Sequence, residues 1–327
     1  MKLLRELTKA HGVSGNETAV AEVIKKYMRP LCDEISEDIT GNVIAHKKGG
    51  GKRIMLAAHM DEVGVIVTYT DKNGFVRFNA VGGLDVRTLP YKRVKFENGT
   101  VGVIGCEEKN FAKKAEISAL YIDIGAQSAE EAEKRVSVGD TAAFVGDMTV
   151  SGDTVISKTL DNRAGCRCLI KAMEILDEKG CDNDIYCAFT VQEEVGLRGA
   201  GTAAYGIEPE IALAVDVTDT GDTPECERMA VKLGGGAAVK LYDRSIICHK
   251  SVREGLIKIA RENDIPYQLE VMTAGGTDAG AIHTSRSGVA TGGISIPCRY
   301  VHSPSGVASV SDMDACAELI AAFCREI

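Results

Sequence analysis

The sequence predicts an α/β protein whose mixed, largely parallel sheet is sandwiched by helices, with a β-rich domain inserted into the chain. After residue 157, apolar strand-like runs alternate with helical patterns, as crossover connections between parallel strands require. Between residues 64 and 156, many short β-rich pieces follow one another, separated by Gly, Asn and Asp. We therefore expect one α/β domain built from residues 1–63 and 157–327, interrupted by a separate domain at 64–156.

The N-terminal segment predicts a helix followed by two strands. Ser14 and Glu17 have the spacing of a capping box, and apolar residues then recur at three- and four-residue steps, as in a one-sided helix. Residues 42–46 and 53–59 are short β-like runs. The second run is apolar along its length, which is typical of a strand covered on both faces of a sheet.

The sequence pattern of the predicted inserted domain is typical of a small β-barrel or β-sandwich. Asn98 and Gly99 lie between two β-like pieces, which is a strong hairpin signal. The one clear helix expected here covers residues 129–136, where Ser128 and Glu131 have capping-box spacing. Many short strands with regular turns favour a closed or layered β-structure.

After residue 157 the sequence again predicts strands that alternate with helices. Apolar residues at helical spacing predict helices at 162–179, 199–205, 250–263 and 311–325. Short apolar runs predict strands at 184–191, 210–216, 267–272 and 290–296. Their alternation favours a mostly parallel sheet with helices on its faces.

Composition and charge exclude several classes of protein. The 327 residues include 47 acidic and 38 basic ones, a net charge of −9, and the basic residues are dispersed. This pattern gives no electrostatic footprint for nucleic acid or an anionic membrane. The N-terminus lacks the apolar core of a signal peptide and no stretch predicts a membrane-spanning helix, so we expect a cytoplasmic protein. Eleven cysteines, several in apolar runs, predict reduced buried thiols rather than disulfides or a thiolate zinc site.

Seven histidine and carboxylate residues are the candidates for chemistry, because they stand at the ends of apolar strand-like runs or in small-residue settings. They are His59, Asp61, Asp161, Glu193, Glu194, Asp216 and His302. The carboxyl ends of parallel strands line one crevice, the usual ligand site of such folds, so these groups are expected to meet there. Taken singly, each has an ordinary structural explanation, such as a helix N-cap or a solvated loop. Their joint occurrence favours a functional site.

Two histidines with several carboxylates suit Zn²⁺, Co²⁺ or Mn²⁺, and the lack of thiolates indicates a catalytic site. The carboxylates outnumber what one ion needs, which favours two ions about 3.5–4 Å apart. Asp161 is the candidate bridge, because a carboxylate has two oxygens. Asp61 is expected to accept the second ring N–H of His59. Glu193 and Glu194 point opposite ways in an extended chain, so one is expected to bind metal and the other to move protons.

Six segments, taken together and in chain order, resemble the co-catalytic metallo-aminopeptidases of the M42 peptidase family. They are AAHMDEVG, TLDNRAG, TVQEEVGLRGA, AVDVT, GGTDAGAI and CRYVHSPSG. The resemblance spans nearly the whole chain. It implies a zinc-peptidase-like α/β fold, a PDZ-like β-barrel involved in assembly as the inserted domain, and a homo-oligomer that forms a tetrahedral dodecamer.

The resemblance also implies a ligand set for two divalent metal ions, Zn²⁺ or Co²⁺, with Mn²⁺ as a further candidate. It makes Asp161 the ligand that bridges the two ions. Glu194 and His302 complete the protein ligands of one ion, and His59 and Asp216 complete those of the other.

The implied reaction removes N-terminal residues from peptides that have a free N-terminus. In this reaction Glu193 is the general base, which takes a proton from metal-activated water and returns it to the leaving amine. Asp61 is the partner of His59. The substrate's α-amino group is expected near one metal ion, which restricts cleavage to N-termini.

Two other functions stay open at this point. A non-catalytic, metal-stabilised assembly module has no need for an unliganded carboxylate such as Glu193, and a glycan hydrolase is disfavoured because the chain has no Trp and only 5% aromatic residues. Side-chain specificity and the native metal are also open. Arg299 either pairs with an acidic substrate side chain or forms a structural salt bridge. Ala237 stands where such proteins usually carry proline, in a loop expected near the substrate.

Overall fold

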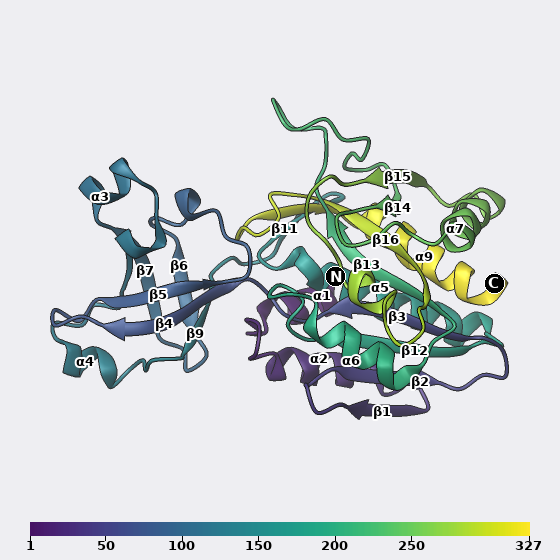
Figure 1. Ribbon diagram of the computed structural model, residues 1–327, viewed down its shortest axis with the longest axis horizontal. Coiled ribbons are helices and arrows are strands. Elements are labelled where there is room, and N and C mark those ends of the chain that lie inside the picture. The colour runs from purple at the N-terminus through teal and green to yellow at the C-terminus, as the bar shows by residue number, and fades with distance from the viewer.

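The computed structural model describes all residues, 1–327. It has two lobes, a larger α/β lobe that contains both chain termini and a smaller β-barrel lobe (Figure 1). None of its helices combines the length and the apolar character that crossing a bilayer needs.

The larger lobe is built on an eleven-stranded mixed sheet. Nine strands run in the order β1-β2-β12-β3-β13-β16-β17-β11-β10, and β14 joins at β16 and pairs with β15. The bounds are β1 Glu34–Glu37, β2 Val43–Lys47, β3 Arg53–His59, β10 Thr149–Ser151, β11 Thr154–Ser157, β12 Asp184–Thr190, β13 Ile211–Thr218, β14 Ala237–Tyr242, β15 Tyr267–Val271, β16 Ala290–Arg299 and β17 Gly306–Ser309. The predicted α/β fold with a mixed sheet is confirmed.

Parallel pairing is concentrated at the centre of this sheet. β12, β3, β13 and β16 lie side by side and all run in the same direction. The outer pairs β1 with β2, β2 with β12, and β16 with β17 are antiparallel. The carboxyl ends of β12, β3 and β13 therefore meet at one edge, where the segments that follow them approach one another.

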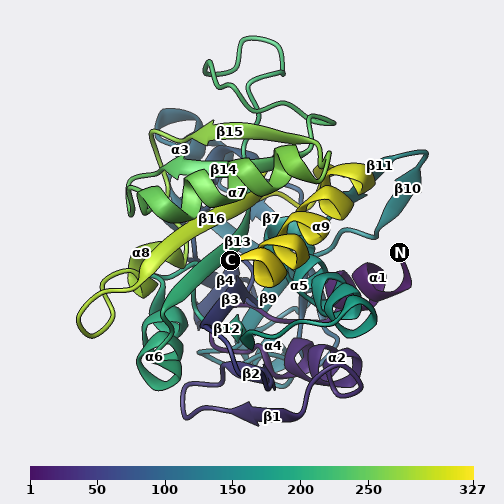
Figure 2. The ribbon, with the colours of Figure 1, turned by 90° about the vertical axis from the view of Figure 1, so that its right-hand side faces the viewer.

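Helices cover both faces of the sheet (Figure 2). Their bounds are α1 Lys2–Lys9, α2 Thr18–Met28, α5 Leu160–Lys179, α6 Arg198–Ile207, α7 Lys250–Glu262, α8 Ala279–Ile282 and α9 Val310–Glu326. Alternate side chains of β3 face the two layers: Ile54 and Leu56 join the core with α1, α2, α5, α7 and α9, while Met55 and Ala57 join the core with α6 and α8. Burial on both faces explains why β3 is apolar along its length.

The smaller lobe is a closed antiparallel barrel in the order β4-β5-β8-β7-β6-β9. Its elements are β4 Gly64–Thr70, β5 Val76–Val81, β6 Arg93–Phe96, β7 Val101–Cys106, α3 Glu108–Lys113, β8 Leu120–Asp123, α4 Ala129–Glu133 and β9 Thr141–Phe144, with 3₁₀ turns at Val86–Thr88 and Ile117–Ala119. β6 and β7 form the predicted hairpin, in which Gly99 has a φ of 92°. The predicted barrel is confirmed, and it has its own apolar core.

The division of the chain at residues 64 and 156 stays a prediction. The six barrel strands lie between Gly64 and Phe144. β10 and β11 come within the range predicted for the inserted domain, but β11 pairs with β17 and so extends the sheet of the larger lobe. We propose that the inserted domain ends before β10.

Of the two N-caps predicted from capping-box spacing, the one at Ser14 is wrong and the one at Ser128 is confirmed. α2 begins at Thr18, and Ser14 does not cap it, because the Ser14 hydroxyl donates to Oδ2 of Asp61 at 2.6 Å. Glu17 accepts from the Gly15 amide instead of closing a capping box. In the barrel, Ser128 does cap α4 through the Glu131 amide, although that helix ends at Glu133. A buried carboxylate elsewhere in the chain outweighs the local signal at Ser14.

The pattern missed five elements of the larger lobe. These are α1, β1, β14, α8 and β17, of which none is longer than eight residues. All eleven cysteines are free thiols, and Cys166, Cys168 and Cys187 are among those buried.

Candidate metal centre

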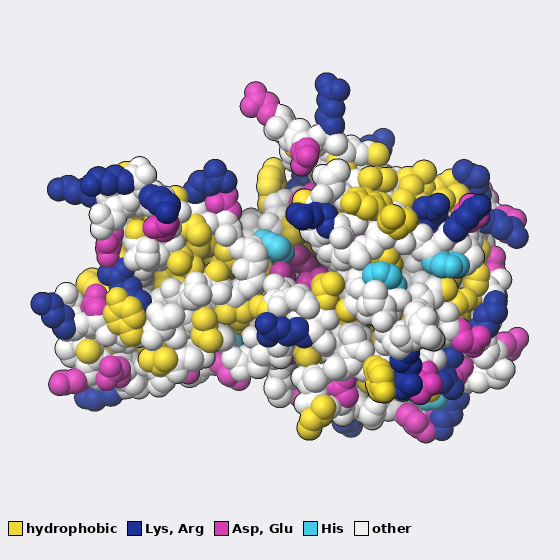
Figure 3. Space-filling model, in the orientation of Figure 1, with side chains coloured by type: hydrophobic (Ala, Val, Ile, Leu, Met, Phe, Trp, Pro, Cys, Tyr) yellow, Lys and Arg dark blue, Asp and Glu magenta, His cyan; other side chains and the backbone are white.

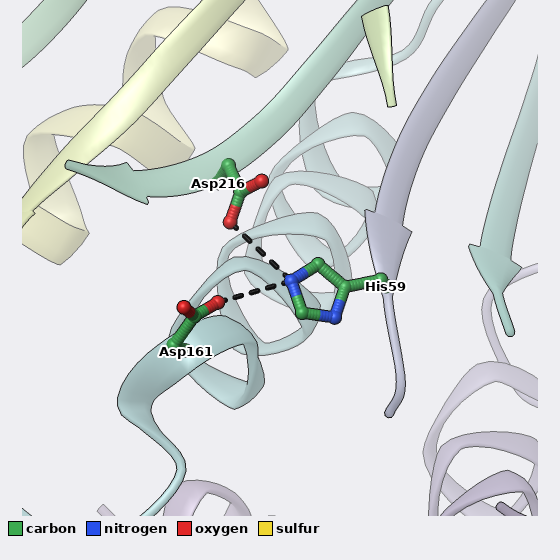
Figure 4. Close-up of side chains that lie close together, drawn as sticks. All are labelled: His59, Asp161 and Asp216. Atoms are coloured by element: carbon green, nitrogen blue, oxygen red, sulfur yellow. Dashed lines mark hydrogen bonds and ion pairs between the residues drawn. The ribbon is translucent and has the colours of Figure 1, made fainter. Parts of the chain in front are cut away.

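His59 stands at the carboxyl end of β3 and is only 1% exposed, because β12 and β13 flank it. Its Nε2 atom lies 3.0 Å from Oδ1 of Asp161 and 3.5 Å from Oδ1 of Asp216 (Figure 4). Asp216 belongs to the neighbouring parallel strand β13, and Asp161 to the start of α5. The ligand atoms of these three residues lie within 4.8 Å of one another, so they form a first cluster that could hold a cation.

Asp61 fixes the other side of the His59 ring. Nδ1 of His59 lies 3.3 Å from Oδ1 of Asp61 and 3.2 Å from its carbonyl oxygen. Asp61 is fully buried, and it also accepts from the amides of Glu193 and Glu194 and from the Ser14 hydroxyl. The imidazole is therefore held with Nδ1 towards Asp61 and Nε2 towards the cluster, the orientation that a metal-binding histidine needs.

Asp161 presents its two oxygens to two different histidines. Oδ1 faces Nε2 of His59, and Oδ2 lies 3.2 Å from Nε2 of His302. Asp161 and Asn162 have non-helical backbone angles at the start of α5, and Asn162 anchors this turn by donating to the Val215 carbonyl at 2.8 Å. This is the geometry of a carboxylate placed between two sites.

The second cluster consists of Asp161, Glu194 and His302. Nε2 of His302 lies 3.2 Å from Oε2 of Glu194. His302 follows β16 in a turn where its φ is 58°. A loop of the barrel lobe closes on this cluster, since a Cβ atom on Gly83 would lie 3.2 Å from the His302 ring.

Glu193 belongs to neither cluster, although it lines the same cavity as Glu194. One oxygen of Glu193 lies 3.9 Å from Nε2 of His59. The chain leaves the extended conformation at Gln192, where φ is 56°, and turns from Glu193 to Gly196. The expectation that the two glutamates point to opposite sides of an extended chain is therefore wrong, because a turn brings both carboxylates to one cavity.

The donors present fit a pair of divalent ions. Two imidazoles and three carboxylates offer nitrogen and oxygen ligands without a thiolate, the set that suits Zn²⁺ and its neighbours in catalytic sites. Oε1 of Glu194 is buried and has no hydrogen-bond partner, although a buried carboxylate oxygen is normally satisfied. Its second oxygen faces His302, so Glu194 retains a free donor atom inside the second cluster.

Crowded charges shift the pKa values of this cluster. Burial raises the pKa of Asp161, but hydrogen bonds from His302 and His59 outweigh it and hold that pKa well below its usual range. Burial, with Asp161 nearby, raises the pKa of Glu194 to about 7. Burial lowers the pKa of His302, but Asp161 and Glu194 together raise it to about 11. A divalent cation would relieve this repulsion among carboxylates by replacing the protons.

A model of the M42 glutamyl aminopeptidase family matches residues 41–319. The chain belongs to the M42 peptidase family. Among curated relatives, an Acetivibrio thermocellus protein that carries an aminopeptidase name is 56% identical over 319 residues, 97% of this chain and 96% of its own. The M42 chain is therefore a peptidase.

Solved structures agree with this membership. An aminopeptidase of Desulfurococcus kamchatkensis is 41% identical with a TM-score of 0.95, covering all of this M42 chain and 94% of its own. The TET1 peptidase of Pyrococcus horikoshii, described as assembling into a tetrahedron or an octahedral shell, is 34% identical with a TM-score of 0.88, covering 100% and 99%. A Thermotoga maritima protein named an endoglucanase is 36% identical with a TM-score of 0.84, covering 99% and 96%.

The M42 chain has a cavity of about 780 Å³ beside both clusters, large enough for several residues of a peptide. Figure 3 shows acidic side chains and a histidine in the hollow between the two lobes. The cavity lining includes Asp219, Glu227 and Arg228, none of which forms an ion pair, and apolar residues such as Met229 and Met272. The lining therefore carries more negative than positive charge near the ligands.

Arg299 forms a structural salt bridge in this M42 peptidase. Its Nε and Nη2 donate to the two oxygens of Asp222 at 3.0 and 2.7 Å, and Asp222 also accepts from the Leu233 amide. A guanidinium occupied in this way offers little charge to a substrate. Of the two interpretations of Arg299, the structure favours the structural one.

Ala237 does not line the cavity of this M42 peptidase. It is buried at the start of β14, and its amide donates to the Pro266 carbonyl at 3.0 Å. Proline could not make this hydrogen bond, since it lacks the N–H group. The expectation that Ala237 bears on substrate specificity is wrong, because the residue belongs to the sheet.

Sequence reasoning did not single out Asp278 of this M42 peptidase, a buried carboxylate close enough to His59 and Asp216 for their charges to affect it. Asp278 is 3% exposed at the start of α8, where one oxygen accepts from the Thr190 hydroxyl and the other has no partner. Burial, with the charges of Asp216 and Asp61 nearby, raises its pKa to about 7. The signal available was its segment GGTDAGAI, in which an acidic residue stands alone among small ones.

Proposed function

We propose that this chain is a dinuclear metal-dependent aminopeptidase, in which two divalent ions occupy the clusters that share Asp161. The observation that carries the proposal is the placement of the two Asp161 oxygens, one towards His59 and one towards His302. Asp216 completes the first ligand set and Glu194 the second. The ligand chemistry fits Zn²⁺ or Co²⁺ first and Mn²⁺ as a further candidate.

Bound divalent ions would supply a water of lowered pKa and a polarising charge for the substrate carbonyl. Glu193 is our general base, because its side chain, only 10% exposed, lies beside the first cluster without belonging to either ligand set. Its carboxylate would take the proton of the attacking water and return it to the leaving amine. Asp61 would keep His59 oriented and, through the Glu193 amide, hold the base in place.

The acidic cavity supports a preference for substrates with a free N-terminus as part of the proposal. A free α-ammonium group is attracted to a cluster of carboxylates, and Asp219 and Glu227 extend this negative wall away from the ligands. A peptide bond inside a chain has no such charge. We therefore propose that the substrates are peptides with a free N-terminus.

Assembly into a homo-oligomer is part of the proposal. The P. horikoshii TET1 peptidase, described as a tetrahedron or an octahedral shell, matches this chain over its full length, barrel included, and a further TET1 structure that covers all of this chain is a dodecamer. Both support a closed assembly of twelve subunits for this chain. The barrel would provide contacts between subunits. A cytoplasmic location stays a prediction.

The test is cleavage of aminoacyl-p-nitroanilides by metal-free protein, alone and after addition of Zn²⁺, Co²⁺ or Mn²⁺. We expect no cleavage without metal and restored cleavage with at least one ion at two ions per chain. Glu193→Gln should remove the activity, whereas Glu254→Gln, an exposed residue of α7, should not. Metal-independent cleavage, or full activity of Glu193→Gln, would contradict the mechanism.

Two other functions are less well supported. The T. maritima relative is named an endoglucanase, but Tyr300 is the only phenyl or phenol ring in the cavity of this chain, so sugar rings find little stacking surface. A non-catalytic assembly module would leave the largely shielded carboxylate of Glu193 at an energetic cost with no role. Incubating the protein with a soluble cellulose substrate tests the first of these directly.

A further inference from the structure

Three charged side chains form a buried cluster beside the proposed metal centre. Nζ of Lys158 donates to both oxygens of Glu62, at 3.0 and 2.7 Å, and Nη2 of Arg163 lies 3.3 Å from the first of these oxygens. Glu62 is 2% exposed, Lys158 8% and Arg163 0%. We call these residues the junction triad. Charges this deeply buried persist only when they are paired and when the surrounding structure holds them.

The junction triad joins two of the three segments that carry the proposed ligands of the first ion, those of His59 and Asp161. Glu62 follows His59 by three residues, and Lys158 and Arg163 bracket Asp161. His59 and Asp161 face each other across these two segments, with Nε2 of His59 3.0 Å from Oδ1 of Asp161. A change in the ion pairs would therefore change the spacing of these two ligands.

The triad lies at one crossing between the lobes and beside the other. The chain enters the barrel at Gly64, two residues after Glu62, and leaves it between β9 and β10, where a Cβ atom on Gly146 would lie 3.2 Å from Cβ of Lys158. The Glu62 backbone is held from the opposite side, since its amide donates to the Gly12 carbonyl at 2.9 Å. A second hydrogen bond anchors the triad to α1, because Nη1 of Arg163 donates to the Leu7 carbonyl.

A small cavity connects the junction triad with the second ligand cluster. It measures about 20 Å³, and its lining includes Glu62 and Lys158 of the triad together with Asp161, Glu194 and His302. Lys158 and the proposed ligands of the second ion therefore border the same space.

We propose that Lys158, held by Glu62, is a positioning residue that sets the spacing between His59 and Asp161 and so determines the affinity for the metal pair. The inference rests on the proposed dinuclear centre. It also implies that the position of the barrel lobe and the geometry of the proposed ligands depend on the same buried ion pairs.

The test is titration of the metal-free full chain with Zn²⁺, followed by calorimetry, and with Co²⁺, followed by its visible absorption. Lys158→Met removes the ammonium group and keeps the length of the side chain, and we expect at least one ion to bind about 10- to 100-fold more weakly, with an altered Co²⁺ spectrum. Lys158→Arg, which keeps the charge, should restore most of the affinity. These readouts do not depend on activity.

Arg167→Met is the matched control. Arg167 lies on α5 one turn after Arg163, but its ion pair, 2.6 Å to Asp314, points to α9 and away from the ligands. We expect it to lower the unfolding temperature without changing metal affinity. If Lys158→Met does not fold, Glu62→Gln takes its place, since it keeps the size of the side chain and removes only the charge.

The outcomes separate this inference from the proposed function. Wild-type protein that binds fewer than two ions would overturn the dinuclear centre itself. Wild-type protein that binds two ions, with Lys158→Met or Glu62→Gln binding both equally well, would overturn the role of the junction triad alone. Equal losses in Lys158→Met and Arg167→Met would likewise overturn it, because they would indicate a general effect on folding.

Discussion

Oδ1 of Asp61 accepts a hydrogen bond from the backbone amide of Glu193 at 3.0 Å. The same oxygen lies 3.3 Å from Nδ1 of His59. One buried carboxylate therefore holds both a proposed metal ligand and the proposed general base. Because β3 and β12 are parallel neighbours, the segments that follow them reach Asp61 from adjacent strand ends.

Asp61→Asn should weaken metal binding by about 10- to 100-fold, because the amide would hold the His59 ring less firmly. Ser14→Ala, which removes only the 2.6 Å hydrogen bond to Asp61, should have a smaller effect of the same sign. Calorimetric titration with Zn²⁺ measures both. Unchanged affinity in Asp61→Asn would contradict the orienting role.

Glu193→Gln should lower kcat by about 10²- to 10⁴-fold and leave the metal content at two ions per chain. The reason is that Glu193 lies beside the first cluster without belonging to either ligand set. Steady-state kinetics combined with metal analysis decides this. Loss of a metal ion in this variant would identify Glu193 as a ligand instead of the base.

Asp161→Asn should reduce the metal content from two ions to one or none, because an amide offers a single, uncharged oxygen where Asp161 faces two histidines. Asp216→Asn is the comparison, since Asp216 belongs only to the first cluster. It should weaken one ion and spare the other. Metal analysis after dialysis gives both answers, and equal behaviour of the two variants would argue against a bridge.

Metal affinity should rise with pH between about 6 and 9. The folded-state pKa of His302 is raised to about 11, above its ordinary value, because Asp161 and Glu194 face it, so the metal-free site holds a proton there at neutral pH. That proton stabilises the metal-free fold below the ordinary histidine pKa, and its contribution is lost as the pH rises through the folded value. Metal must displace it, so the dissociation constant should fall about tenfold per pH unit for each proton released. Titration in buffers of different ionisation enthalpy counts the protons, and a pH-independent affinity would contradict the model.

Substrates with an acidic N-terminal residue should be cleaved more slowly than those with leucine or lysine, because the carboxylates that line the cavity outnumber its one unpaired cation, Arg228, while Asp222 occupies Arg299. Asp222→Ala frees the guanidinium. It should raise kcat/KM for a glutamyl relative to a leucyl p-nitroanilide by about 2- to 5-fold, a modest gain because Arg299 is partly exposed to water. Adding Arg299→Ala should cancel the gain. A wild-type preference for glutamyl substrate would show that another cation recognises the acidic side chain.

Much of the candidate site could be predicted because its residues stand at the ends of recognisable strands. β3 and β13 end at or near His59 and Asp216, and both are apolar runs bounded by polar residues. Parallel strands carry such ends to one edge regardless of their separation in the sequence. The pattern therefore places the ligands together without any knowledge of side-chain geometry.

Other features depend on contacts that no local pattern encodes. The Ser14 hydroxyl has the sequence signature of a cap, yet it donates to Asp61, 47 residues further along the chain. The direction of the Glu193 side chain depends on a turn at Gln192, so the alternation of side chains along an extended strand does not apply there. The structural role of Arg299 depends on Asp222, which lies 77 residues away in the chain and accepts its hydrogen bonds.

The α/β class, the inserted β-rich segment and the residue types at the strand ends could be predicted, because hydrophobic periodicity and strand termini are local properties of a chain. Three relationships exist only in the folded chain: Asp161 faces two histidines, Glu193 stands outside both ligand sets, and Glu62 meets Lys158 and Arg163 at the junction of the lobes. Such relationships are distances between residues far apart in the chain. They follow from how the strands and helices pack, since packing brings distant polar groups out of water and requires each to find its partner.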